Sequence, residues 1–360
     1  MQSIALQHSD VIVGVDTHKD EHVAVALDGV GRRLGEILIE ATAAGYAEVL
    51  TWADELGPPA VFGVEGTGSY GSGLARFLRR EGRNVIEVSR PPRRGERRLD
   101  GKSDPIDAEH AARAVLAGTA TAIPKLADGV VESIRLVKIA RDTAVKAHSQ
   151  AMITLKTVIV TSPDELRAEL KSLTDFKLMT TCASYESAAG LSDPSAAMRH
   201  VLSSLALRWL ELHEEIKIHT RHLKNLTKTA APELVAEFGI GFDIAAELLV
   251  TAGDNSNRVR SEAAFAKLCG ACPIPASSGK SKRHRLNRGG NRQANAALYR
   301  AVIVRMRWHA PTISYVERRT AEGLTKREII RCLKRFVARD VFKLLPAPFT
   351  PSVRTPLRST

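Results

Sequence analysis

The 360-residue sequence predicts a mixed α/β domain at its N-terminal end, followed by a mainly helical second half. Three apolar segments with strand-like alternation come first and are joined by short turns, which predicts an antiparallel meander. Strand and helix patterns then alternate. A meander followed by alternating units is typical of a ribonuclease-H-like mixed sheet, whereas a doubly wound fold alternates from its first strand.

The elements of this first domain follow from local pattern and turn signals. The strands are expected at 11–16, 22–27, 34–39, 60–64 and 84–88, and the helices at 43–56, 70–81 and 104–117. Two long helical segments come next, at 130–160 and 195–228. The second has apolar residues in alternating steps of three and four, the seam of a coiled coil; a plain helical bundle is the alternative.

These patterns divide the chain into four regions. We expect a nuclease-like domain over 10–125, a helical or coiled-coil oligomerisation segment over 126–230, a C-terminal domain over 231–345 and a disordered tail over 346–360. In the third region Gly239-Ile240-Gly241 separates two helical patterns. This is the pattern of a helix-hairpin-helix, whose backbone N–H groups bind phosphate, although an ordinary turn between helices has the same spacing.

The charge distribution predicts a polyanionic partner. The net charge is +12, and the segment 263–316 contains no Asp or Glu but ten Lys or Arg. A single-sign field of this extent fits the phosphate backbone of double-stranded DNA. The residues expected to contact nucleic acid are Gly239, Gly241, Lys280, Lys282, Arg283, Arg285, Arg288, Asn291 and Arg292.

The cysteines and the hydropathy exclude other classes. Four cysteines in a chain of this length do not indicate a disulfide scaffold. Cys269 and Cys272 have the spacing of half a zinc site, but no second pair completes it, so two small buried residues are the better interpretation. No signal peptide and no run of eighteen apolar residues is seen, which predicts a cytoplasmic protein without a membrane partner.

Four carboxylates form the candidate metal site. Asp104 and Asp107 open a helix in the stretch 102–108, where Asp104 is the expected N-cap. The simplest interpretation is that the two acids only stabilise the start of that helix. Asp16 ends the first strand and Glu65 follows the fourth, and these two strands are neighbours in a ribonuclease-H-like sheet. Carboxylates packed together repel unless a cation neutralises them. Hard oxygen ligands suit Mg²⁺, with Mn²⁺ as the alternative, and a metal pair suits phosphodiester displacement.

Two further motifs allow other functions. The segment GTGSYG at 66–71 follows a strand and opens a helix, which is the spacing of a dinucleotide-binding site. The preceding meander and the acid at Glu65 speak against that interpretation. The segment SSGKS at 277–281 offers either a phosphate-contacting hydroxyl or a nucleophile that a metal or base activates.

Taken together, several stretches resemble the DEDD-type transposases of bacterial insertion sequences, whose relatives include the pilin-gene invertases. The resemblance rests on GVDTHKDEHVAVALD, VEGTGSYGSGLARFLRREG, VSRPP, KSDPIDAEHAARAV and GACPIPASSGKSKRHRLNRGGNRQANAALY. It runs from about residue 10 to residue 310. It implies a RuvC-like nuclease fold, a metal-binding tetrad, and a C-terminal domain whose serine attacks DNA.

The resemblance assigns roles to single residues. The tetrad matches Asp16, Glu65, Asp104 and Asp107, and the serine matches Ser278 best, with Ser277 as the fallback. Members of this family are similar to recombinases that a structured RNA guides and that act as oligomers, dimers or tetramers, on donor and target DNA. The expected function is therefore strand exchange through a phosphoserine intermediate. The alternatives are a Holliday-junction-type nuclease without that intermediate, a non-catalytic helix-hairpin-helix DNA-binding protein and, last, a dinucleotide-dependent enzyme.

Overall fold

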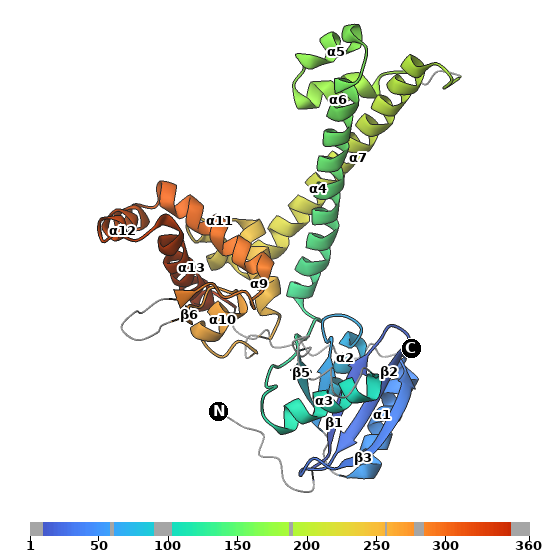
Figure 1. Cartoon of the computed structure of the whole chain (residues 1–360), viewed down its shortest axis with the longest axis vertical. Coiled ribbons are helices and arrows are strands. Elements are labelled where there is room, and N and C mark those ends of the chain that lie inside the picture. The colour runs from blue at the N-terminus through green and yellow to red at the C-terminus, as the bar shows by residue number, and fades with distance from the viewer. Residues whose placement is uncertain are drawn as a thin grey trace, which may run out of the picture. The chain divides into compact units, whose positions relative to one another are not determined.

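The chain forms two compact units in a computed structural model, Met1–Leu126 and Ala127–Thr360 (Figure 1). The structure describes residues 10–57, 61–89, 103–186, 190–255, 258–276 and 284–346. Each unit is described by itself.

Unit 1 is built on a five-stranded mixed sheet. Its strands are β1 (Ile12–Thr17), β2 (Glu21–Leu27), β3 (Arg33–Glu40), β4 (Val61–Glu65) and β5 (Asn84–Val88). The strand order is β3-β2-β1-β4-β5; the first three strands pair antiparallel, and β4 and β5 join parallel to β1. The predicted meander and the parallel strands after it are confirmed. A mixed sheet of this kind followed by helices is consistent with a ribonuclease-H-like domain.

Helices cover both faces of this sheet. They are α1 (Ala43–Leu56), α2 (Ser72–Arg80) and α3 (Asp104–Leu116). Because side chains alternate along a strand, Val13 and Val15 pack with α1 and α2, whereas Ile12 packs with α3. The even-numbered residues of β1 therefore face α3.

Two glycines allow α3 to lie directly against the strands. A Cβ atom added at Gly14 of β1 would lie 2.0 Å from the carbonyl oxygen of Ala108 and 2.3 Å from the backbone nitrogen of Ala112. A Cβ atom at Gly63 of β4 would lie 2.7 Å from a methyl carbon of Val115. No side chain fits in that space. The close packing brings the first turn of α3 beside the C-terminal end of β1.

Unit 2 begins with a long helical hairpin. Its two long helices are α4 (Val130–Val160) and α7 (Pro194–Ala230). They run antiparallel: Arg141 Nε donates to Thr220 Oγ1 at 3.0 Å, and further along α4 the His148 ring stacks on Trp209 with centroids 4.2 Å apart. The predicted long helices are confirmed to within two residues at each end. The coiled-coil interpretation stays a prediction.

Two short helices between the long ones were not predicted. They are α5 (Asp164–Lys171) and α6 (Asp175–Ala183), at the tip of the hairpin in Figure 1. Each buries only a few apolar side chains, among them Leu166, Leu170 and Met179, against Leu155 and Leu202 of the long helices. Segments of eight and nine residues are too short for a helical period to separate them from a loop.

The rest of unit 2 is a helical domain with a two-stranded ribbon. Its elements are α8 (Pro232–Ala236), α9 (Phe242–Ala252), α10 (Glu262–Leu268), β6 (Ile274–Pro275), β7 (His284–Arg285), α11 (Arg292–Trp308), α12 (Ala310–Ala321) and α13 (Lys326–Lys343). The helices share one apolar core, which includes Phe265, Leu298 and Val337. Among the described residues no helix has the length and apolar character needed to cross a membrane.

One member of the basic segment is not available to a ligand. Arg305 of α11 is 6% exposed and donates to the carbonyl oxygen of Phe238 and to the carboxylates of Glu237 and Asp340. It joins the α8–α9 turn to α11 and α13. The single-sign field seen in the sequence is therefore smaller at the surface than the count of Lys and Arg indicates.

Candidate functional site

The acid cluster lies at the end of β1, on the face that α3 covers. Asp16 belongs to the even-numbered set of β1 and its side chain is only 9% exposed. The helix begins at Asp104 itself, with Ser103 as its N-cap, so the expectation that Asp104 is the N-cap was wrong. As a first-turn residue, Asp104 directs its carboxylate toward the end of β1 instead of capping the helix.

A histidine that was not predicted joins the two aspartates. His18 Nε2 lies 3.3 Å from Asp16 Oδ2 and 3.4 Å from Asp104 Oδ1. Ligand-type atoms of these three residues all lie within 4.8 Å of one another. The signal was present in the sequence, because residues two apart on a strand share a face and His18 follows Asp16 by two.

Asp107 and Glu65 also lie near the C-terminal ends of β1 and β4. Burial raises the pKa of the Asp16 carboxyl above its ordinary value; His18 lowers it, and the negative charges of Asp107 and Asp104 raise it. Glu65 is 5% exposed and directly follows Val64, which is the registered partner of Val15. Asp16, Asp104 and Asp107 are thus brought together, and Glu65 occupies the neighbouring strand end.

The glycine motif after β4 holds Glu65 in place. Gly66 has φ of 60°, in the left-handed region that favours glycine. A Cβ atom at Gly71 would lie 2.5 Å from the carbonyl oxygen of Glu65. Thr17 Oγ1 also donates to that oxygen, at 3.1 Å, and so ties the end of β1 to the end of β4. These contacts give the glycines a role in a tight turn without a bound dinucleotide.

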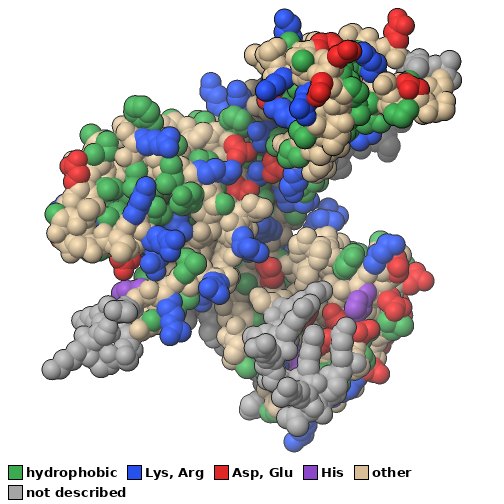
Figure 2. Space-filling model, turned by 45° about the horizontal axis from the view of Figure 1, so that its top comes forward, with side chains coloured by type: hydrophobic (Ala, Val, Ile, Leu, Met, Phe, Trp, Pro, Cys, Tyr) green, Lys and Arg blue, Asp and Glu red, His purple; other side chains and the backbone are tan. Residues whose placement is uncertain are grey.

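The predicted nucleic-acid residues of unit 2 divide into two groups. Ser277, Ser278, Lys280, Lys282 and Arg283 lie outside the described residues. Arg285, Arg288 and Arg292 are exposed, and Lys and Arg side chains are spread over the visible face of unit 2 (Figure 2). Asn291 has a structural part as well, because its side-chain oxygen accepts from the backbone N–H groups of Gln293 and Ala294 and caps α11.

The Gly-Ile-Gly turn connects α8, of five residues, to α9. Gly239 has φ of 79° and packs against α11, where an added Cβ atom would lie 3.1 Å from the carbonyl oxygen of Ala301. Gly241 is the N-cap of α9 and has open space around its Cα. In the first turn of α9, Asp243 pairs with Arg141 at 3.1 Å and with Arg300 at 3.3 Å. The helix-hairpin-helix interpretation stays a prediction.

The cysteine pair is part of the core and its edge. Cys269 is buried, and burial raises the pKa of its thiol to about 12. Cys272 is half-buried and its Sγ accepts from Asn287 Nδ2 at 3.1 Å. Within the described parts of the chain, the only group with metal-ligating spacing is the one at Asp16.

Comparisons with known proteins agree with this geometry. A family model of DEDD-type IS110 transposases matches residues 13–162, the stretch that contains all four acids. A second model, described as the transposase IS116/IS110/IS902 family, matches residues 233–317. Both models describe IS110-type transposases, so the chain resembles that family in two separate parts. Transposases of this family are enzymes of DNA recombination.

One curated relative of this chain is the insertion element IS110 uncharacterized 43.6 kDa protein of Streptomyces coelicolor. The two are 30% identical over 148 residues, which is 40% of this chain and 36% of the relative. The match therefore spans about a third of the relative's length.

The residues of the acid cluster fit the divalent metal that DEDD transposases typically use. Carboxylate oxygens are the ligands that hard divalent cations prefer. Asp16, Asp104 and Asp107 lie close together, and burial and the two neighbouring negative charges raise the pKa of Asp16; a divalent cation would offset this repulsion. His18 offers a nitrogen ligand at the same place.

Proposed function

We propose that the chain cuts and rejoins DNA strands as the transposase of a bacterial insertion sequence. The proposal is carried by the convergence of Asp16, Asp104 and Asp107 with the buried Glu65 at one sheet edge. These four residues would hold the metal, Mg²⁺ or alternatively Mn²⁺. When bound, such a metal stabilises the negative charge that develops on a phosphate during displacement.

The protein supplies rigid ligands and the nucleophile. Gly14 fixes α3 against β1, and Thr17 ties β1 to β4, so the carboxylates are held before the DNA arrives. Ser278, or Ser277 as the fallback, gives up its proton and attacks phosphorus. The bond from serine Oγ to phosphorus forms as one phosphodiester P–O bond breaks. The released strand end takes up a proton and leaves as a free hydroxyl, which balances the proton that the serine gives up. A hydroxyl of the second DNA strand then displaces the serine and reseals the backbone.

A strand-exchange assay tests the proposal. Two duplexes that carry the element ends and a target should recombine only with a divalent metal. A structured RNA transcribed beside the gene should be required as the guide. Recombination in the presence of a chelator would contradict the metal assignment. Recombination without RNA would contradict the proposal that an RNA guides the reaction.

Binding of DNA phosphates by the basic residues of unit 2 predicts that the affinity for DNA depends on the salt concentration. Replacing Lys280, Arg283, Arg285, Arg288 and Arg292 together by alanine should flatten the plot of log affinity against log salt. The slope should change by about 0.9 for every phosphate that is no longer neutralised, because each neutralised phosphate of duplex DNA releases its counter-ions.

Fluorescence anisotropy over a salt series measures this slope. A charge-retaining variant, with each Arg changed to Lys and Lys280 to Arg, should keep the wild-type slope. An unchanged slope in the alanine variant would place the DNA surface elsewhere.

Self-association is part of the proposal, and the outer face of α4 supports it. Ile139, Ile153 and Val160 are each more than 50% exposed and lie at multiples of seven residues. A stripe of apolar residues with this spacing is suited to packing against another helix. The helical hairpin is therefore the proposed oligomerisation element of a dimer or tetramer.

The proposal also includes an active site that is shared between two subunits. The acids belong to unit 1, whereas Ser278 belongs to the sequence of unit 2, beyond helices of 31 and 37 residues. A serine hydroxyl is a poor nucleophile unless a metal or base lies close by. We expect the acids of one subunit to serve the serine of another, which keeps the enzyme inactive until the oligomer and both DNAs have assembled.

Complementation measures this sharing. A variant with Asp104→Asn and Asp107→Asn and a separate Ser278→Ala variant should each be inactive alone. When the two are mixed and allowed to form mixed oligomers, strand exchange should recover. No recovery in verified mixed oligomers would mean that each chain builds its own site.

A further inference from the structure

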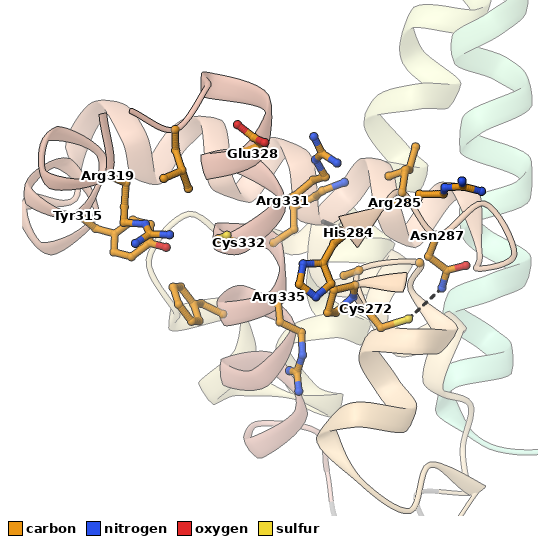
Figure 3. A pocket seen from close by; sticks show the side chains of 17 residues that line it. Cys272, His284, Arg285, Asn287, Tyr315, Arg319, Glu328, Arg331, Cys332 and Arg335 are labelled. Carbon is orange, nitrogen blue, oxygen red and sulfur yellow. Dashed lines mark hydrogen bonds between the residues drawn. The ribbon is translucent and has the colours of Figure 1, made fainter. Parts of the chain in front are cut away.

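A pocket of about 800 Å³ lies in unit 2, apart from the acid cluster. Three stretches that are distant in sequence line it: 270–273, 284–287 and residues between 315 and 336. Figure 3 shows Tyr315 and Arg319 on one side, His284 and Arg285 on the opposite side, and Arg331 of α13 between them. Its volume is within the range of small-ligand sites, about 300–1,000 Å³.

The lining of the pocket is strongly cationic. Its basic side chains are His284, Arg285, Arg319, Arg331, Lys334 and Arg335. Glu328 is the one acid in the lining that the structure describes. That carboxylate accepts from the backbone N–H and the hydroxyl of Thr325 in a capping box, so it is committed to the start of α13. The field inside the pocket is therefore positive and suits an anion.

One buried cation of the lining has no carboxylate partner, and two guanidinium groups each keep one donor nitrogen unsatisfied. Lys334 is 6% exposed and donates to the neutral amide oxygen of Asn295 at 2.8 Å; no ion pair with a carboxylate is seen for it within the described residues. Arg319 and Arg335 each pair with a carboxylate through another guanidinium nitrogen, with Glu322 and with Glu262. Arg319 Nε and Arg335 Nη1 are buried and have no hydrogen-bond partner in the described structure. Unsatisfied buried donors are costly. A ligand with several acceptor oxygens would satisfy those that it reaches.

The pocket also has an aromatic wall. The rings of Tyr315 and Phe336 meet edge to face, with centroids 5.5 Å apart, and Phe336 is 39% exposed. The Arg319 guanidinium lies 6.0 Å from the centre of the Tyr315 ring. Nucleic-acid bases stack on aromatic rings and on guanidinium planes. An anion site beside such a wall has the two features that a nucleotide requires.

We propose that this pocket receives one unpaired nucleotide of a nucleic-acid strand, with its phosphate toward Lys334 and Arg331 and its base against Tyr315 and Phe336. This rests on the proposed function, because strand exchange produces unpaired nucleotides at the exchange point. A base inside a duplex is stacked and paired, and it enters such a pocket only after it leaves the helix. The pocket therefore distinguishes distorted or unpaired DNA from intact duplex.

The test compares two DNA duplexes that differ by one nucleotide. One is fully paired, and the other has a single unpaired 2-aminopurine, whose fluorescence is quenched when it stacks on an aromatic ring. The wild-type protein should bind the second duplex more tightly and quench its fluorescence. Phe336→Ala and Phe336→Leu should lower this preference about five- to 150-fold, the range expected for loss of one base–aromatic stack. Phe336→Leu keeps an apolar side chain, so its effect does not depend on misfolding.

Matched variants separate the pocket from the rest of the surface. Arg331→Gln should weaken binding of the unpaired duplex and lower its salt slope by about 0.7 to 0.9. Arg327→Gln removes one charge from an exposed position of the same helix outside the pocket, and should leave the preference unchanged. Phe176→Ala removes an exposed ring at the hairpin tip and should likewise have no effect.

Three results would overturn the proposal. The first is equal affinity for both duplexes, and the second is a preference that survives in the Phe336 and Arg331 variants. The third is displacement of the unpaired nucleotide by free dAMP at concentrations near those of the DNA, which would make the pocket a site for a small nucleotide. If strand exchange proceeds while any of these is found, only the nucleotide pocket fails. If neither duplex is bound at all, the proposed function fails first.

Discussion

Replacing Asp16 by asparagine should abolish strand exchange, with a loss of roughly a thousandfold or more, and leave the fold intact. Removing one negative ligand weakens a hard-metal site, and a bound metal supplies several kcal/mol of transition-state stabilisation. The side chain is buried beside the negative charges of Asp107 and Asp104. Asparagine removes that repulsion, so the metal-free variant should melt at the same temperature as the wild type or higher.

The same loss of activity is expected for Glu65→Gln, Asp104→Asn and Asp107→Asn. Asp20→Asn is the matched control, because this exposed acid follows β1 closely and lies outside the cluster. It should keep wild-type activity. Adding Mg²⁺ should raise the melting temperature of the wild type and of Asp20→Asn, but not that of Asp16→Asn. If three of the four acid variants remain active, the metal assignment is wrong.

Arg305→Ala should destabilise unit 2 by roughly 2–4 kcal/mol, because it removes three charge-assisted hydrogen bonds and leaves the carbonyl oxygen of Phe238 without its donor. Glu237 and Asp340 are partly exposed and regain water, which keeps the loss below that of a fully buried pair. Urea unfolding followed by circular dichroism measures the change.

Arg307→Ala is the control for this prediction. Arg307 lies two residues further along α11 and is exposed, so its loss should change the unfolding free energy by no more than about 0.5 kcal/mol. Equal destabilisation by both variants would mean that the buried hydrogen bonds of Arg305 contribute little.

The sheet and the long helices could be predicted because their signals are local. Alternation of apolar residues placed the five strands, and Pro105 after Asp104 placed the start of α3 to within one residue. The expected strand order placed Asp16 beside Glu65, and the resemblance assigned Asp104 and Asp107 to the same metal site. The proximity of Asp16 to Asp104 depends on Gly14, whose role becomes visible only when α3 is seen against β1.

Other features depend on contacts between distant segments, and sequence patterns do not show them. Arg305 looks like its basic neighbours, yet it is buried between two acids that are 68 and 35 residues away. The spacing of His18 from Asp16 indicates a shared face, but the contact of His18 with Asp104 arises only because α3 brings Asp104 to it. The pocket wall pairs Tyr315 with Phe336 across two helices. Counting charges or rings along the chain cannot separate such residues from ordinary surface ones.

Trapping a covalent protein–DNA adduct tests the central claim most directly. Wild-type protein is incubated with Mg²⁺, the proposed guide RNA and two labelled duplexes, one of which is nicked so that resealing is prevented. The products are separated on a denaturing gel. We predict a labelled protein band whose adduct maps to Ser278 or Ser277. The band should be lost with Asp16→Asn and when both serines are replaced by alanine. Metal-dependent cleavage without any such band would contradict the serine mechanism and favour a hydrolytic nuclease.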